Sequence, residues 1–83
     1  MLTLRMAIYA ATTTICNGYE IDEIAEQPDD KARLSCGEDT IAEVNLAQTI
    51  ELDSDGEATA KDIDGEELDF EFRVSRPMTL ADI

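Results

Sequence analysis

The stretch that decides the fold runs from residue 50 to residue 74 and reads IELDSDGEATAKDIDGEELDFEFRV. From Leu68 to Val74, apolar and charged residues alternate without a break. This period of two is typical of a β-strand with one buried and one solvated face. Ser54-Asp55-Gly56 and Asp64-Gly65 are turn signals, because glycine adopts the left-handed conformation that tight turns require. The stretch is therefore predicted to form strands joined by hairpin turns.

The two turns also predict which residues face each other. A connection that ends on Gly56, and an odd-length connection around Gly65, bring the apolar residues of three segments onto one face. The expected neighbours are Leu52 with Ala58, Ile50 with Ala60, Ala60 with Leu68, Ala58 with Phe70 and, on the other face, Lys61 with Glu67. Pattern and turn chemistry agree, and they predict a three-strand antiparallel meander from about Gln48 to Ser75.

The first part of the chain allows two structures. A hairpin around Asn17-Gly18 would place Thr14 opposite Ile21, and the β-branched residues before Cys16 favour it. The rival is a helix over residues 4–16 that stops at Gly18. The apolar stripe of that helix would hold Leu4, Ala7, Ile8, Ala11 and Ile15.

Residues 39–49, DTIAEVNLAQT, are ambiguous in the same way. Thr40 with Glu43 forms the capping-box pattern of a helix start, whereas the alternation that continues to Ile50 is typical of a strand. Arg76-Pro77 is predicted to end the last strand, because proline cannot donate to a β-ladder. The expected fold is mainly β, an antiparallel meander, or α+β with one helix, in a single small domain of residues 1–83.

The charge balance limits the possible partners. The chain has 20 Asp and Glu against 6 Lys and Arg, a net charge of -14, where roughly 2 to 8 charges are usual for a small domain. Residues 20–30 hold six acidic and no basic residues, and residues 51–71 hold ten acidic residues with only Lys61 among them. Direct binding of nucleic acid or an anionic membrane is disfavoured, because both need Lys and Arg. The natural partner is a basic surface or a cation.

The N-terminal residues and the cysteines indicate an intracellular protein without a zinc site. Residues 1–18 are too short and too rich in threonine to span a bilayer, and they show no clear cleavage pattern of a signal peptide. We therefore expect a cytoplasmic protein. Cys16 and Cys36 form no Cys-x-x-Cys motif and the chain has no histidine, so buried free thiols are expected and zinc is not. No cofactor is expected.

Residues 51–62, ELDSDGEATAKD, partly match the calcium loop of an EF-hand. The ligand positions would be filled by Glu51, Asp53, Asp55, Thr59 and Asp62, with Gly56 at the sharp turn. Position one is Glu51 instead of aspartate, position twelve is Asp62 instead of the longer glutamate, and no helix is indicated before the loop. A calcium-binding module is thus one alternative function.

An enzyme is not expected. Without histidine, acid-base or nucleophilic chemistry would depend on carboxylates, thiols or serines, and none of these lies in a recognisable catalytic motif. The four glycines form no phosphate-binding loop.

The acidic residues themselves are the candidate functional residues. Carboxylates two residues apart on one strand face stand about 6.6 Å apart, and rows of them resemble the spaced charges of a phosphate backbone. The predicted primary contact field comprises Asp53, Asp55, Glu57, Asp62, Asp64, Glu66, Glu67, Asp69 and Glu71. A second patch comprises Glu20, Asp22, Glu23, Glu26, Asp29 and Asp30.

The segments GYEIDEIAEQPDD (18–30) and ELDSDGEATAKDIDGEELDFEF (51–72) carry a resemblance. In size, acidity and lack of catalytic motifs the chain resembles the small phage-encoded anti-defence proteins, including anti-CRISPR and anti-restriction DNA mimics. The resemblance implies a non-enzymatic inhibitor that binds the basic nucleic-acid-binding surface of a CRISPR effector, a restriction enzyme or another DNA-processing protein in the host cytoplasm. A small acidic structural or regulatory subunit is the remaining alternative, and an open sheet edge would allow a homodimer.

Overall fold

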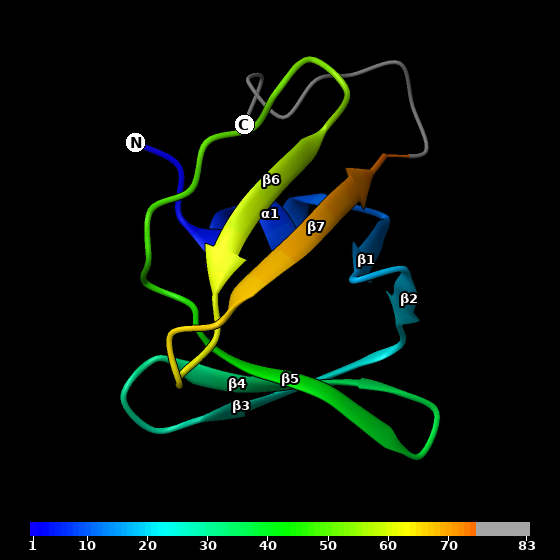
Figure 1. The fold of residues 1–83 in the computed structure, drawn as a ribbon, viewed down its shortest axis with the longest axis vertical. Coiled ribbons are helices and arrows are strands. Elements are labelled where there is room, and N and C mark those ends of the chain that lie inside the picture. Colours follow the sequence, from blue (N-terminus) through cyan, green and yellow to red (C-terminus); the bar gives the residue numbers. More distant parts are fainter. Residues whose placement is uncertain (75–83) are drawn as a thin grey trace.

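The computed structural model describes residues 1–74, which form two antiparallel β-sheets and one short helix (Figure 1). In chain order the elements are α1 (Leu4–Ala10), β1 (Thr13–Cys16), β2 (Tyr19–Ile21), β3 (Glu23–Gln27), β4 (Lys31–Cys36), β5 (Asp39–Asn45), β6 (Glu57–Lys61) and β7 (Glu67–Arg73). The prediction of a mainly β fold with one helix in a single small domain is confirmed. The predicted strand end at Arg76-Pro77 lies outside the described residues.

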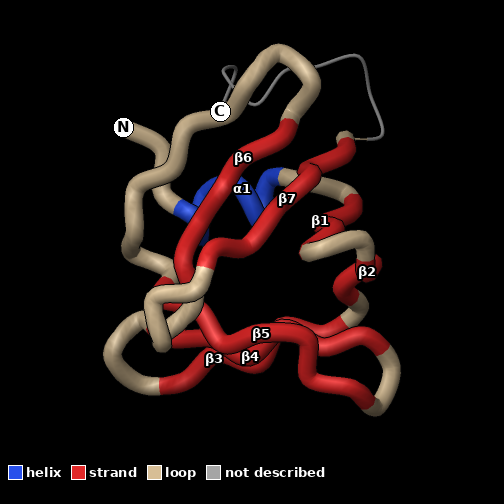
Figure 2. Tube along the Cα trace, in the orientation of Figure 1, coloured by secondary structure: helices blue, strands red, loops and turns tan. Residues whose placement is uncertain are grey.

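The two sheets meet at two corners. The four-stranded sheet has the order β2-β1-β7-β6, and the three-stranded sheet β3-β4-β5 lies across the lower part of the view (Figure 2). At one corner only Asp22 separates β2 from β3, and its N–H donates to the Ser35 carbonyl. At the other corner the Ile63 N–H donates to the Glu43 carbonyl. The two sheets therefore form a flattened, nearly closed barrel.

One aliphatic core fills this barrel. Alternate residues of β1, β4, β5, β6 and β7 are buried, and the buried face of α1 joins them. The two phenylalanine rings, Phe70 and Phe72, stack with their centroids 5.5 Å apart. The buried apolar residues are Leu4, Ala7, Ile8, Cys16, Ala32, Leu34, Ala42, Val44, Leu46, Ile50, Ala58, Ala60, Leu68, Phe70 and Phe72. In β6 and β7 polar residues occupy all the alternate positions, so these two strands present a polar outer face to solvent.

Two predicted hairpins are present in the predicted register. In the β6–β7 hairpin, the described pairs include Ala58 with Phe70, Ala60 with Leu68 and Lys61 with Glu67. In the β1–β2 hairpin, Thr14 faces Ile21 across the turn at Asn17-Gly18. Both hairpins are closed by a glycine at positive φ, as the turn chemistry requires.

The prediction of a third meander strand before β6 is wrong. Leu52 and Ile50 do not pair with β6; the backbone of this segment turns instead to the N-terminus, where Ile50 N–H donates to the Leu2 carbonyl and Leu4 N–H to the Gln48 carbonyl. Ile50 is thereby buried in the core beside α1. The other side of β7 is taken by β1, which explains why the alternating pattern of β7 has neighbours on both edges.

Residues 4–16 contain both of the rival structures in sequence. The helix forms only over Leu4–Ala10, where Thr3 caps its start by accepting a hydrogen bond from the Met6 N–H, and the strand follows at Thr13–Cys16. A helix to Cys16 with a stop at Gly18 is therefore wrong. The β-branched residues after Ala11 disfavour a longer helix, because their side chains crowd the preceding turn.

Residues 39–45 form the strand β5, so the helix start suggested by Thr40 and Glu43 is wrong. Strand alternation buries Ala42 and Val44 against the core, which a helix through the same residues would not do. The burial of alternate residues outweighs the local capping pattern.

Candidate partner-binding surface

The outer face of the four-stranded sheet holds four residues of the predicted primary contact field, and the other five lie in the two turns that flank β6. In β7 the buried residues alternate with the outward Glu67, Asp69 and Glu71, and in β6 Glu57 and Thr59 point the same way. Because these positions follow from strand alternation, the face could be predicted from the sequence. The sheet brings together carboxylates from both strands on one surface.

A row across this face places like charges side by side. Glu57 lies directly opposite Glu71, and Glu71 faces Ile15 on β1, which in turn faces Glu20 on β2. Like charges at directly opposite positions of an antiparallel pair destabilise the sheet. The row therefore costs stability, and it also joins Glu20 of the predicted second patch to the primary field.

Cations lie beside this face but do not fill it. Arg73 contacts Glu71 of the same strand through its Nε atom, and Lys61 stands opposite Glu67. The outer face of the three-stranded sheet is different, since its Arg33 lies 3.7 Å from Glu43. Strong negative charge is thus concentrated on one of the two sheets.

Two turns of the same sequence, Asp-x-Asp-Gly-Glu, end β6 at both sides with the same hydrogen bonds. Asp53 Oδ1 accepts from the N–H of Asp55 and of Glu57 at 2.8 and 3.0 Å. Asp62 Oδ1 accepts from the two equivalent N–H groups, both at 2.9 Å. The first aspartate of each turn therefore builds the turn, whereas the later carboxylates of each turn are exposed.

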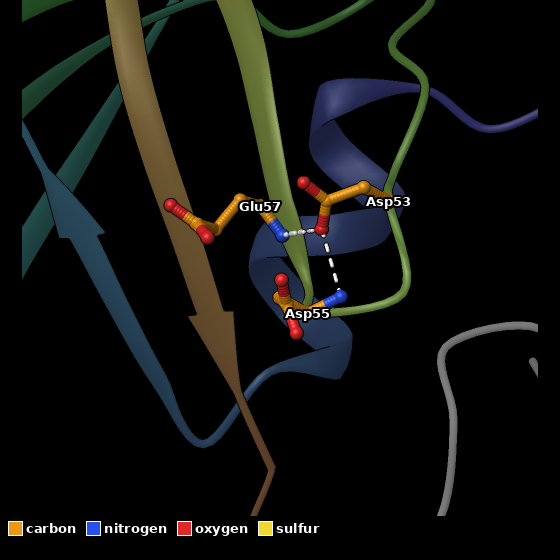
Figure 3. A group of neighbouring side chains, drawn as sticks. All are labelled: Asp53, Asp55 and Glu57. Carbon is orange, nitrogen blue, oxygen red and sulfur yellow. Dashed lines mark hydrogen bonds between the residues drawn. The ribbon is translucent and has the colours of Figure 1, made fainter.

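The first of these turns places three exposed carboxylates close together (Figure 3). Ligand atoms of Asp53, Asp55 and Glu57 lie within 4.8 Å of one another. The EF-hand interpretation of residues 51–62 is nevertheless wrong, because residues 57–61 form β6 and carry Thr59 along a strand. Asp53 uses one carboxylate oxygen for the turn itself. The geometry is that of a tight turn, in which the Asp53 N–H donates to the Glu57 carbonyl at 3.0 Å.

The predicted second patch is divided. Arg5 of α1 pairs with Glu26 and, at 3.2 Å, with Asp30, while the Tyr9 hydroxyl donates to Glu26 at 2.6 Å. The hydrogen bonds from Tyr9 and Arg5 lower the pKa of Glu26, and the bond to Glu26 raises the pKa of Tyr9. These two carboxylates hold α1 against the β3–β4 hairpin. They are not free for a partner.

The remaining residues of the second patch have mixed roles. Asp22 accepts a hydrogen bond from the Gly37 N–H at 2.8 Å, and Asp29 occupies the β3–β4 turn at positive φ. Glu20 and Glu23 are exposed. Of the two predicted patches, the structure thus brings together the primary field and Glu20, and it places Glu26 and Asp30 in a separate cluster with Arg5. This cluster could not be predicted from the sequence, because Arg5 and Tyr9 lie more than 15 residues before Glu26 in the chain.

The two cysteines differ in environment. Cys16 is fully buried, as predicted, whereas Cys36 is partly exposed and both are free thiols. Burial, with the nearby Asp69 carboxylate, raises the pKa of Cys16 from 9.0 to about 11. Because the thiolate is the reactive form, the Cys16 thiol is unreactive at neutral pH in the folded protein.

We expect alkylation to distinguish the two thiols. With iodoacetamide at pH 8, Cys36 should be modified and Cys16 should react at least about 100-fold more slowly, because its reaction requires opening of the core.

The raised pKa of Cys16 also predicts a loss of stability in alkali. The contribution of Cys16 to the free energy of unfolding is complete below pH 9 and is lost as the pH rises through 9 to about 11. Mass spectrometry measures the first result and urea unfolding the second. Equal modification of both thiols in the folded protein would contradict the protected position of Cys16.

No family model matches the chain, and neither the curated proteins nor the solved structures include a significant match. Within residues 1–74, no helix has the length and apolar character needed to cross a membrane.

Proposed function

We propose that this protein is a non-enzymatic inhibitor whose acidic sheet binds a basic nucleic-acid-binding surface of a defence or DNA-processing protein in the cytoplasm of a host cell. A CRISPR effector or a restriction enzyme has the required surface. The acidic sheet is the outer face of β2-β1-β7-β6 with the turns that flank β6. On it the carboxylates stand in for the phosphates of nucleic acid and exclude the true ligand from the groove.

The observation that carries this proposal is the row with Glu57 opposite Glu71. A surface shaped only for stability would place opposite charges or uncharged residues at these positions. Natural proteins break such local rules at functional sites and compensate the cost elsewhere. A basic groove would supply that compensation by adding positive charge beside Glu57 and Glu71, of which Glu71 already contacts Arg73.

A pull-down tests the proposal directly. The tagged protein is incubated with a lysate of its host at low and at high salt, each with and without EDTA. Recovery of a nucleic-acid-binding complex at low salt, lost at high salt and unaffected by EDTA, would support the proposal, because surface charge pairs are screened by ions. Recovery that needs calcium, or no such partner at either salt, would overturn it.

Charge reversal on β7 should separate binding from folding. We expect Asp69→Lys with Glu71→Lys to weaken binding to the recovered target by about 10-fold or more, mainly through slower association. The fold should survive, since both side chains point to the outer face. Surface plasmon resonance measures the binding and circular dichroism the fold.

The matched control is Glu38→Lys with Asp39→Lys, which changes the net charge equally at the β4–β5 turn. A similar loss of affinity in this control would show that only total charge matters. The assignment of β7 as part of the contact surface would then fail.

A further inference from the structure

One edge of β6 does not pair with another strand. The backbone groups that face this edge have hydrogen-bond partners at both ends of the strand but not in its middle. Near its start, Glu57 C=O accepts from the Asp53 N–H at 3.0 Å, and Glu57 N–H donates to Asp53 Oδ1. At its end, Lys61 N–H donates to Gln48 Oε1 at 3.0 Å, and Lys61 C=O accepts from Gln48 Nε2 at 2.8 Å. The Gln48 amide thus replaces a peptide group of a neighbouring strand.

Thr59 lies between these two capped residues, and its backbone groups face the same free edge. Its opposite residue, Asp69, exchanges hydrogen bonds with Asn17 on the other side of β7, so Thr59 and Asp69 form a pair without mutual hydrogen bonds. Among residues 1–74, nothing bonds to the N–H or C=O of Thr59. The edge of β6 therefore has a gap of one residue.

An open hollow of about 480 Å³ is present at this gap. Beside this hollow the segment before Asp53 does not run along β6, because Gln48 and Ile50 pair with the N-terminus. Ala58 and Phe70, which are only 9% and 2% exposed, are also among the residues that line it. The polar lining consists of Glu51, Asp53, Glu57, Thr59 and Asp69.

We propose that this hollow receives an arginine side chain of the protein partner, with its guanidinium donating to the Thr59 carbonyl and to the surrounding carboxylates. The inference rests on the proposed function and identifies the anchor point on the acidic sheet.

The chemistry of the lining selects this occupant. The carboxylates and the Thr59 carbonyl are acceptors, against one donor, the Thr59 N–H, and the guanidinium offers five donors in a plane with weaker hydration than an ammonium group. An extended peptide strand does not fit, because Asp53 and Gln48 already occupy both ends of the edge. A second copy of this chain is disfavoured by a net charge of -14 on each molecule.

A titration of the isotope-labelled protein with N-acetyl-arginine methylamide at low salt tests the site without the partner. We expect saturable changes of the amide signals of Thr59 and Glu51. The citrulline analogue, which has the same shape without charge, should cause no saturable change. The lysine analogue should bind more weakly than arginine.

Two variants give the decisive comparison. Glu51→Gln should weaken arginine binding by about threefold or more, whereas Glu38→Gln, with the same change in net charge on a distant turn, should not. Thr59→Trp should abolish binding by filling the hollow with no change in charge. Equal effects of Glu51→Gln and Glu38→Gln, or signal changes spread over all acidic residues, would overturn the arginine site.

Failure of the arginine site is distinguishable from failure of the proposed inhibitor function. A failed titration with a successful pull-down of a nucleic-acid-binding complex overturns the arginine site alone. Saturable arginine binding in the hollow without such a complex in the pull-down overturns the inhibitor proposal and leaves the site in place.

Discussion

Replacing Gly56 by alanine should destabilise the protein by about 3 kcal/mol, whereas the same change at Gly65 should cost about 1 kcal/mol. Both glycines hold the same position in an Asp-x-Asp-Gly-Glu turn, with φ of +80° and +86°. An alanine at either position is strained by this left-handed conformation. Only at Gly56 would the new Cβ also meet a backbone atom, the Phe72 carbonyl oxygen, at 2.8 Å.

The contact with Phe72 cannot relax easily. Gly56 C=O accepts the Phe72 N–H at 2.9 Å, so the two residues are held at the end of the β6–β7 ladder. Relief of the clash would break this bond and move the stacked phenylalanine rings of the core. Urea unfolding of the two variants measures the difference directly, and Gly65→Ala is the matched control for strain alone. Equal losses in the two variants would contradict the close approach at Gly56.

The strands that could be predicted are those in which pattern and turn agree. From Leu68 to Phe72 the alternation is unbroken, and the glycine turn before it fixes the register, so the β6–β7 hairpin follows from local sequence. Ile50 and Leu52 carry the same alternation but not the same pairing. Their partner was decided by the N-terminus, which is distant in sequence and competes for the same backbone groups. Local pattern contains no information about such a competitor.

The candidate surface, like the strands, could be predicted from the sequence only in part. Strand alternation alone places Asp69 and Glu71 on the outer face. The pairing of Glu26 with Arg5 and Tyr9 could not be predicted, because both partners belong to a helix whose position depends on the tertiary fold. The role of Asp53 and Asp62 as turn formers is visible in the repeated motif only after the shared hydrogen bonds are known.

Gln48 is the second residue whose replacement is expected to reduce stability strongly. Replacing Gln48 by alanine should destabilise the protein by about 2–3 kcal/mol, because three hydrogen bonds of roughly 1 kcal/mol each are lost. These bonds join its amide to the Asn45 carbonyl and to both backbone groups of Lys61. They close the corner between β5 and β6, so hydrogen exchange of the Lys61 amide should accelerate more than that of amides inside the β6–β7 ladder.

Two further variants separate the hydrogen bonds from the volume of the side chain. Gln48→Glu keeps the shape and the acceptor but removes both donors, and it adds a negative charge beside two backbone carbonyls. It should therefore be at least as destabilising as Gln48→Ala. Gln27→Ala on β3 removes the same side chain from another strand and should change stability by less than about 0.5 kcal/mol. If Gln48→Glu were as stable as the wild type, the amide would not be acting as a strand partner, and the corner between β5 and β6 would depend on the Val44–Asp62 bridge with its Ile63–Glu43 bond.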